Sequence, residues 1–357
     1  MLNTFNFELG NVPELEKISL NNFDLKDAVI LRSPNWLGDA IMTFPALMCI
    51  KKLLPTNVKL ILISPPNLKK LYDTIDEIDQ VISLEKAHSM WSKNDVNNLK
   101  KVNAGVALLF NNSPRDVYFL KKAGIKRLFG AAARFRGFFM TKAWKFPKRI
   151  KGMNNLQHSD KYLAMTYALG ASKWEGELPT FNFASSEISE DIINFAKESK
   201  LLIIAPGAAY GPAKRWPAEY FTEVAKQWIN RNGKVIAIGT QNEKPITEEI
   251  SNKLNNKEFY DLAGATSLIE LMYLLKNCKL CIANDSGTMH LSAGLGGEGI
   301  AIYGSTDPTA TAPISKKWTI MYNQLDCSPC FKRECPLNTY QCLKQITPEM
   351  IIDKFNI

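Results

Sequence analysis

The sequence predicts an α/β protein built from two Rossmann-like halves that face each other across a cleft. Three observations support this fold class. Its 357 residues exceed one ordinary domain and suit two. Short apolar runs alternate with amphipathic stretches, which is the pattern of a parallel sheet covered by helices. The alternation occurs twice, on either side of a polar, turn-rich segment at 177–191.

The first half begins with the apolar run DAVILRS at 27–33, which predicts a strand, and the pattern at 40–54 predicts a helix. Further apolar runs predict strands at 58–64, 79–84 and 104–110. The stretch at 155–170 predicts a helix that closes the half, because Gly170 is a typical residue just past a helix end.

The second half restarts with LLIIA at 201–205, a predicted strand. The stretch at 217–233 predicts an amphipathic helix, with Pro217 in its first turn and Gly233 just past its end. The remaining predicted elements are a strand at 234–239, a strand at 279–285 with a helix after it, a strand at 299–304 and a helix at 347–356.

Two loops of the second half follow predicted strands, at the sheet edge where open α/β sheets bind ligands. One is PGAAYGPAKRWP at 206–217, and the other is NDSGTMH at 284–290. The amides of residues 286–288 would point out of a helix N-terminus, which favours phosphate, and Lys214 would add a full positive charge. Together the loops predict a diphosphate site. The alternative for NDSG is a simple Asn/Asp/Ser helix cap.

The first half has a comparable loop, SPNWLGDAI at 33–41. It contains no G-x-G-x-x-G, so a dinucleotide fingerprint is missing. Asp39 follows its single glycine and is a candidate general base that projects into the cleft. The alternative is a carboxylate that only stabilises the helix N-terminus. Ser33 and Asn35 flank this loop as candidate ligand contacts.

Positive charge is concentrated in one stretch, because no acidic residue lies between Asp116 and Asp160. That stretch contains eleven basic residues: Lys121, Lys122, Lys126, Arg127, Arg134, Arg136, Lys142, Lys145, Lys148, Arg149 and Lys151. Aromatic residues lie among them. Such a stretch suits a membrane surface, a phosphorylated ligand or a nucleic acid, and the alternative is a solvated basic face.

The N-terminus has neither the basic nor the apolar region of a signal peptide, and no apolar run reaches the roughly 18–20 residues that span a bilayer. We therefore expect a cytoplasmic protein with reduced cysteines. Four cysteines form C-x2-C-x4-C-x6-C: Cys327, Cys330, Cys335 and Cys342. They can hold a structural metal or remain reduced or paired, and their spacing is not a common zinc pattern.

The loop motifs carry a family resemblance. NWLGDAIMTFPAL, PGAAYGPAKRWP and NDSGTMHLSAGLG, followed by GIAIYGSTDPTATAP, resemble the lipopolysaccharide heptosyltransferases of glycosyltransferase family nine, the type II enzymes most of all. The resemblance runs from about residue 28 to about residue 355, with the motifs in the same order. It implies a GT-B fold and an inverting transfer of heptose from ADP-L-glycero-β-D-manno-heptose to the inner-core heptose of Kdo-lipid A.

The resemblance also implies roles for individual residues. Asp39 matches the catalytic base and Lys214 the phosphate-binding lysine. The residues that match the donor-binding set are Asp285, Ser286, Gly287, Thr288 and His290, with Gln241 or Glu243 matching the residue near the donor's ribose. His290 also fits a buried core position. Because no D-x-D triplet occurs in the sequence, we expect no obligatory metal and no cofactor.

The implied domains are an N-terminal extension at 1–26, an acceptor-binding domain at 27–180, an ADP-heptose-binding domain at 181–346, and a C-terminal helix at 347–357 that can pack back on the first domain. The expected partners are ADP-heptose, the phosphorylated Kdo-lipid A core, and the inner face of the cytoplasmic membrane through residues 121–152, with no nucleic acid. The alternatives are a type I or III acceptor, a non-catalytic nucleotide-sugar binder, and a nucleic-acid binder that no motif supports.

Overall fold

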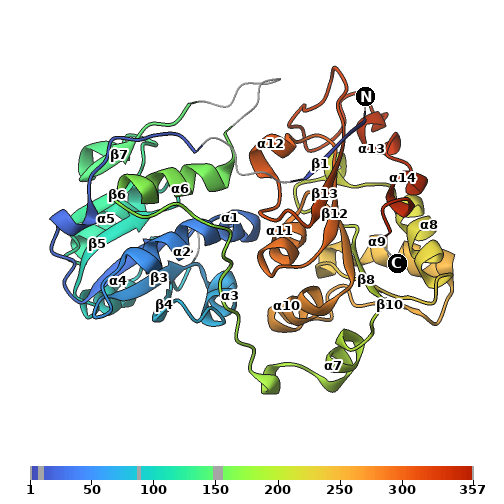
Figure 1. Ribbon diagram of the computed structural model, residues 1–357, viewed down its shortest axis with the longest axis horizontal. Helices are drawn as coiled ribbons and strands as arrows, with labels where there is room; N and C mark the ends of the chain where they lie inside the picture. The colour runs from blue at the N-terminus through green and yellow to red at the C-terminus, as the bar shows by residue number, and fades with distance from the viewer. Residues whose placement is uncertain (1, 7–11, 87–89, 148–155, 356–357) are drawn as a thin grey trace. The chain divides into compact units, whose positions relative to one another are not determined.

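The chain divides into two compact units, each with its own parallel sheet, as the sequence predicts (Figure 1). The computed structural model describes residues 2–6, 12–86, 90–147 and 156–355. Among these, the amino-terminal unit contains 12–147 and 156–182, and the carboxy-terminal unit contains 2–6 and 183–355.

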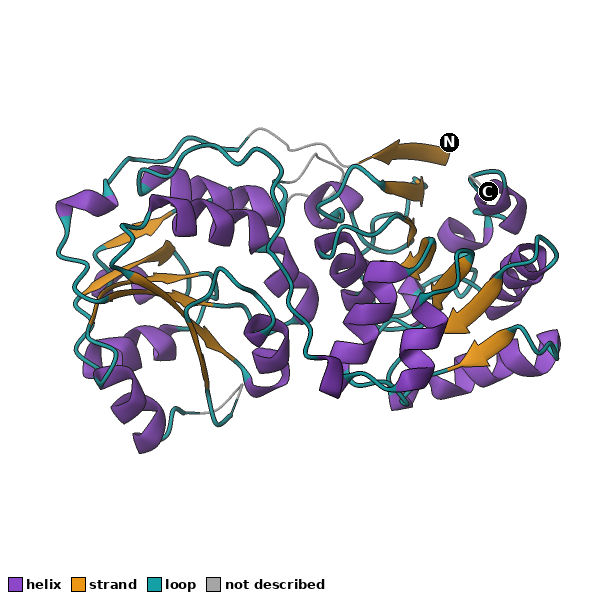
Figure 2. Cartoon of the chain, turned by 60° about the horizontal axis from the view of Figure 1, so that its bottom comes forward, coloured by secondary structure: helices purple, strands orange, loops and turns teal. Residues whose placement is uncertain are grey.

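The amino-terminal unit is a six-stranded sheet with helices on both faces (Figure 2). Its strands are β2 Ala28–Arg32, β3 Lys59–Ser64, β4 Gln80–Ser83, β5 Ala104–Leu109, β6 Arg127–Ala131 and β7 Lys142–Trp144. Its helices are α1 Leu37–Met42, α2 Phe44–Leu53, α3 Lys69–Asp73, α4 Lys93–Lys100, α5 Pro114–Lys122 and α6 His158–Ala168, with 3-10 turns η1 Leu20–Asn22, η2 Pro66–Leu68 and η3 Arg136–Phe139. The strands lie in the order β4-β3-β2-β5-β6-β7, all parallel.

The predicted helix at 40–54 is two helices. α1 ends at Met42 and α2 begins at Phe44, with Pro45 in its first turn. Proline has no N–H and its ring clashes with the preceding helical turn, so it is tolerated only where a helix begins. At the break between the two helices, Thr43 Oγ1 donates to the carbonyl of Ala40 at 2.6 Å and so satisfies an acceptor at the end of α1.

The carboxy-terminal unit has seven strands: β1 Leu2–Asn6, β8 Leu201–Ala205, β9 Lys234–Ala237, β10 Phe259–Asp261, β11 Leu280–Asn284, β12 Gly299–Tyr303 and β13 Trp318–Asn323. Its helices are α7 Glu190–Ala196, α8 Ala218–Ile229, α9 Lys244–Leu254, α10 Leu268–Asn277, α11 Gly287–Gly294, α12 Pro308–Thr311, α13 Gln341–Lys344 and α14 Pro348–Ile352, with η4 Ser185–Glu187, η5 Pro212–Lys214 and η6 Gln241–Glu243. The order is β1-β13-β12-β11-β8-β9-β10, and only β1 is antiparallel to its neighbour.

Both sheets are buried on both faces, which explains their apolar strands. Every residue of β2, β5, β8, β11 and β12 is buried. A parallel strand covered on both sides reads as a continuous apolar run rather than as an alternating one. The two half-folds were therefore visible in the sequence.

The structure shows where the described residues at both ends of the sequence pack. The N-terminal extension is not one segment: residues 2–6 form β1 of the carboxy-terminal sheet, whereas residues 12–26 lie on the amino-terminal unit. The C-terminal helix was expected to be able to pack back on the first domain, and the structure shows α14 packed against α8 within the carboxy-terminal unit. Ile351 is fully buried there, and the Phe355 ring lies 4.9 Å from that of Trp228.

Candidate functional site

The two predicted loops of the carboxy-terminal unit lie together. They follow β8 and β11, which are parallel neighbours in the sheet, so both loops leave the same edge. Asn284, fully buried at the end of β11, joins them through its side chain. Its Nδ2 donates to the carbonyl of Pro206 at 2.7 Å, and its Oδ1 accepts from the backbone N–H of Trp216 at 3.0 Å. The first loop is therefore fixed against the second.

Lys214 and Asp285 form a nearly buried ion pair where these loops meet. Lys214 Nζ lies 2.5 Å from Asp285 Oδ2, and the two side chains are 14% and 4% exposed. Thr306 Oγ1 donates to the same carboxylate oxygen at 2.6 Å. A buried pair is stable only when further hydrogen bonds satisfy the charges, and Thr306 supplies one. Asp285 therefore holds the Lys214 ammonium in place.

The N-terminus of α11 is not capped by the serine that begins it. Ser286 is the N-cap residue, but its side chain makes no cap hydrogen bond. Among the described residues, the buried hydroxyls of Ser286 and Ser305 have no hydrogen-bond partner. The Ser286 side chain of the NDSG motif therefore does not act as a simple helix cap in the structure. The first amides of α11 keep their capacity to bind an anion beside Lys214.

Tyr210 and Arg333 extend this site and were not found from the sequence. The Tyr210 ring centroid lies 5.0 Å from Lys214 Nζ and 5.4 Å from the guanidinium carbon of Arg333. The loop and the later segment are joined by backbone, because the N–H of Ala213 donates to the carbonyl of Arg333 at 2.9 Å. Since about 120 residues separate Arg333 from Tyr210, no local pattern indicates the contact.

Glu243 has a structural role at the start of η6. Its Oε2 accepts from the N–H and the Oγ1 of Thr240 at 2.8 and 2.9 Å. Its carboxyl group also lies against Gly207, where an added Cβ would stand 2.2 Å away, so only glycine fits there. Gln241 lies beside Gly264, and His290 is 4% exposed within α11. Their contacts with a ligand remain predictions.

Asp39 lies in the first turn of α1, in the amino-terminal unit, and is paired with a histidine. Its Oδ1 is 3.3 Å from Nδ1 of His158, the first residue of α6. Both side chains are about one-third exposed, at 31% and 32%. His158 was missed because 119 residues separate it from Asp39.

The loop before α1 is held by a buried ion pair. Arg32 Nε donates to Asp116 Oδ2 at 2.7 Å, and both side chains are buried. The same guanidinium donates to the carbonyl of Ser33 and to Asn35 Oδ1, at 2.6 and 2.8 Å. Burial lowers the pKa of Arg32, and the neighbouring Asp116 opposes that shift. These bonds through Ser33 and Asn35 fix the conformation of the loop that leads to Asp39.

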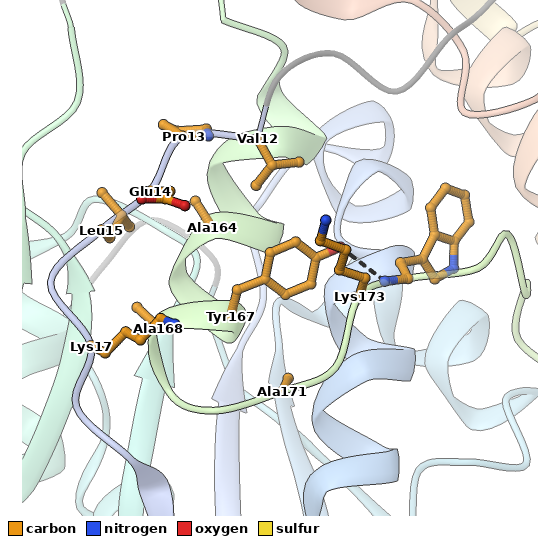
Figure 3. Close-up of a pocket in the computed structure, with 11 residues that line it drawn as sticks. Val12, Pro13, Glu14, Leu15, Lys17, Ala164, Tyr167, Ala168, Ala171 and Lys173 are labelled. Atoms are coloured by element: carbon orange, nitrogen blue, oxygen red, sulfur yellow. Dashed lines mark hydrogen bonds between the residues drawn. The ribbon is translucent and has the colours of Figure 1, made fainter.

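A hollow of about 540 Å³ lies on the amino-terminal unit, between the segment before β2 and α6 (Figure 3). Figure 3 shows Tyr167 of α6 between Glu14 and Lys173, with its hydroxyl accepting from the backbone N–H of Trp174 at 2.9 Å. Residues 12–17 form one wall. No predicted site residue lines this hollow, so it is separate from the Asp39 site.

The four cysteines of the C-x2-C-x4-C-x6-C pattern are free thiols that line one small hollow of about 20 Å³. Burial, reinforced by its neighbouring thiols, raises the pKa of Cys342 to about 11. Within the described ranges, no three side chains of His, Cys, Asp or Glu are placed together as metal ligands. In those same ranges, no helix is both long and apolar enough to cross a bilayer.

Comparisons with known proteins agree with this arrangement. The family model described as glycosyltransferase family 9 (heptosyltransferase) matches residues 96–341. Lipooligosaccharide heptosyltransferase 2 of Haemophilus influenzae is 29% identical, over 92% of this chain and 98% of that one. The structure of E. coli ADP-heptose lps heptosyltransferase II covers 91% of this chain and 96% of its own, at 23% identity and a TM-score of 0.75. E. coli heptosyltransferase WaaC with ADP covers 91% and 98%, at 15% identity and a TM-score of 0.68. The GT-B fold class is confirmed.

Proposed function

The chain belongs to glycosyltransferase family 9, the heptosyltransferases, and from this premise we propose that it moves L-glycero-D-manno-heptose from ADP-heptose to the inner-core heptose of Kdo-lipid A. It is a glycosyltransferase. The observation that carries the proposal is the cationic cradle in the carboxy-terminal unit, where Lys214 meets the uncapped N-terminus of α11.

The donor's diphosphate binds at that cradle. The α11 amides contribute about half a positive charge, and Lys214, oriented and partly offset by Asp285, contributes an ammonium donor. The structure of E. coli heptosyltransferase WaaC was solved with ADP, which supports a nucleotide diphosphate as the ligand. As the glycosidic bond breaks, negative charge grows on the leaving ADP, and these fixed donors stabilise it where it develops.

Asp39 acts as the general base. Its carboxylate takes the proton of the acceptor hydroxyl as that oxygen attacks the anomeric carbon from the face opposite ADP, so the anomeric configuration inverts. His158, 3.3 Å away, is a positioning residue that holds the carboxylate in one orientation. The reaction uses no metal ion, because the cations of the protein stabilise the leaving group.

The acceptor is a phosphorylated lipid, so we place the enzyme in the cytoplasm, on the inner face of the membrane. The basic residues at 121–147 belong to the amino-terminal unit, and the basic stretch at 121–152 suits both the acceptor's phosphates and anionic lipids. Residues 148–152 of this stretch lie outside the described residues.

An acceptor panel tests the proposal. The protein is incubated with ADP-heptose and truncated cores that carry zero, one or two heptoses, and products are read by mass spectrometry. A gain of one heptose on the one-heptose core supports the proposal. A gain only on the zero-heptose core would show that the acceptor is that of a type I enzyme. A gain only on the two-heptose core would show that it is that of a type III enzyme. Binding of ADP-heptose without any gain in mass identifies a non-catalytic binder.

A further inference from the structure

The amino-terminal unit exposes four aromatic side chains on α5 and on the loop after β6, and three of them, Tyr118, Phe135 and Phe139, line one hollow. We call residues 134–139, which follow β6, the aromatic loop. Phe135, Phe138 and Phe139 of this loop are 88%, 87% and 62% exposed, and Tyr118 of the neighbouring α5 is 58% exposed. In the described part of the chain, only Trp36, Met90 and Leu337 are other large apolar side chains with comparable exposure. A cluster of this kind on a protein surface marks an interaction site.

The aromatic loop and α5 enclose a hollow of about 220 Å³. Tyr118, Phe135 and Phe139 form its apolar walls, and the cationic residues Lys121 and Arg134 also line it. Lys122 lies on the same helix, with its Nζ 6.0 Å from the Tyr118 ring centroid. The surface therefore combines exposed aromatic rings with positive charge, and no acidic residue occurs in the sequence between 117 and 159.

The loop is held in its outward conformation by Arg136. This side chain is 1% exposed, and its Nε and Nη2 both donate to the carbonyl of Ala131, at 3.0 and 2.8 Å. Arg134 and Phe135 adopt left-handed backbone conformations, with φ of 47° and 60°. Such conformations are unfavourable for residues with side chains, and they persist only where the surroundings impose them. Phe135 is therefore presented to solvent by the fold itself.

Arg136 also leaves one donor available at this hollow. Its Nη1 is buried and has no hydrogen-bond partner in the described ranges, although the side chain lines the hollow. Burial without a bonded carboxylate lowers the pKa of Arg136 to about 10. An anionic group at the mouth of the hollow would compensate this charge, in addition to those of Lys121 and Arg134.

We propose that the aromatic loop and Tyr118 insert into the interface of an anionic phospholipid bilayer, with Lys121, Lys122 and Arg134 against its headgroups. Aromatic rings backed by lysine and arginine are the composition of interfacial membrane anchors. This inference rests on the proposed membrane-surface function and names the residues that make the contact.

Sedimentation of the full chain with sucrose-loaded vesicles tests the inference. We expect the parent to bind vesicles that contain phosphatidylglycerol about tenfold more tightly than pure phosphatidylcholine vesicles, and high salt to weaken that binding. The double variant Phe135→Ser, Phe138→Ser should lose about tenfold in affinity for the anionic vesicles. The control Leu337→Ser, which removes a 61% exposed apolar side chain from the other unit, should bind like the parent.

Three further readouts separate the explanations. Circular dichroism and the melting temperature of the double variant should match those of the parent, because both rings are already exposed. Its rate with a soluble truncated acceptor should also be unchanged. Loss of vesicle binding without loss of transfer therefore supports the membrane contact and does not bear on the proposed function. A parent that transfers heptose but ignores anionic vesicles overturns the inference and leaves the function standing. Concentration-dependent dimerisation that the double variant abolishes, without vesicle binding, also overturns it and assigns the surface to self-association.

Discussion

At the residue scale, the charged groups of the two units are held in different ways. Lys214 is nearly buried and is fixed by a carboxylate that a threonine also holds. Asp39 is one-third exposed and contacts the imidazole of His158. A base must exchange its proton with the acceptor, whereas an electrostatic stabiliser must stay in place as charge develops. The two environments suit these two tasks.

Replacing Asp39 with Asn is expected to abolish proton transfer and to leave the cradle for ADP intact. The amide keeps the shape of the side chain but cannot accept the acceptor's proton, so kcat should fall by about 10²- to 10⁴-fold. Initial rates measured by mass spectrometry check the loss of transfer, and calorimetry checks that ADP affinity is retained. His158→Gln is the matched control: it keeps the base, retains measurable transfer and shifts the pH–rate profile. Undiminished turnover in Asp39→Asn would remove Asp39 from the role.

Only some of the site was accessible from the sequence at this scale. Lys214 and the loop at 284–290 could be brought together because each follows a predicted strand of one parallel sheet, and they do meet. His158 and Arg333 could not be found in that way. Each reaches its partner through tertiary packing across more than 100 residues, and neither stands in a motif at the end of a strand.

At the element scale, helix ends carry much of the local order. Ser92, Ser113 and Ser267 each accept a hydrogen bond from the backbone N–H three residues later, which begins α4, α5 and α10. Thr240 and Glu243 form the same kind of box before α9. These caps satisfy backbone donors that a helix leaves open, and those of α4, α10 and η6 are reciprocal. α11 is the contrast, because its N-cap serine makes no such bond.

Removing the Glu243 carboxylate tests the cap at the start of η6. Glu243→Ala deletes the acceptor for the N–H and hydroxyl of Thr240 and should lower the free energy of unfolding by about 1 kcal/mol. Glu243→Gln keeps an acceptor oxygen and should lose less. Glu249→Ala, on the exposed face of α9, is the control and should change stability little. Urea denaturation of the four proteins measures the differences. Equal losses for the Ala variants at 243 and 249 would contradict a capping role.

Element prediction succeeded where a strand is buried on both faces. The strand at 201–205 was predicted with the bounds that the structure gives, because all five residues are apolar. The helix at 40–54 was predicted without its break, since Pro45 acts at one position inside an otherwise continuous apolar pattern. β10 and β7 were missed because each has only three residues, too few to show a period.

At the scale of the whole molecule, one buried carboxyl group affects stability. Asp160 of α6 is 1% exposed, and its Oδ1 has no hydrogen-bond partner in the described part of the chain. Burial disfavours its charged form and raises its pKa from 3.8 to about 6. The unfolded chain thus loses this proton at lower pH than the folded chain does. Between about pH 4 and pH 6, the free energy of unfolding therefore falls as pH rises.

Asp160→Asn should stabilise the protein at neutral pH and not at pH 4. The amide does not ionise, so it avoids a cost of about 3 kcal/mol that the charged carboxylate imposes above pH 6. Urea denaturation of parent and variant at a series of pH values measures the difference, which should shrink toward zero as the pH falls to 4. A difference that stays constant across this range would show that the effect is steric rather than electrostatic.

The whole-chain architecture was predicted because two halves repeat one alternation of elements, with a polar segment between them. What the sequence did not indicate was where the ends of the chain pack. α14 lies on α8 because Ile351 fits the apolar face of that helix, a match that depends on shape rather than on pattern. β1 has only five residues, which are far in sequence from the strand that pairs with them.

The pairing of β1 with β13 sets an order of events during synthesis. Leu2 is opposite Asn323, so β1 leaves the ribosome more than 300 residues before the strand that pairs with it. Until then its amide and carbonyl groups must be satisfied by water. The nascent amino-terminal unit can mature in the meantime, since its own strands are complete by residue 144. Closure of the outer sheet edge thus reports that β13 has been synthesised.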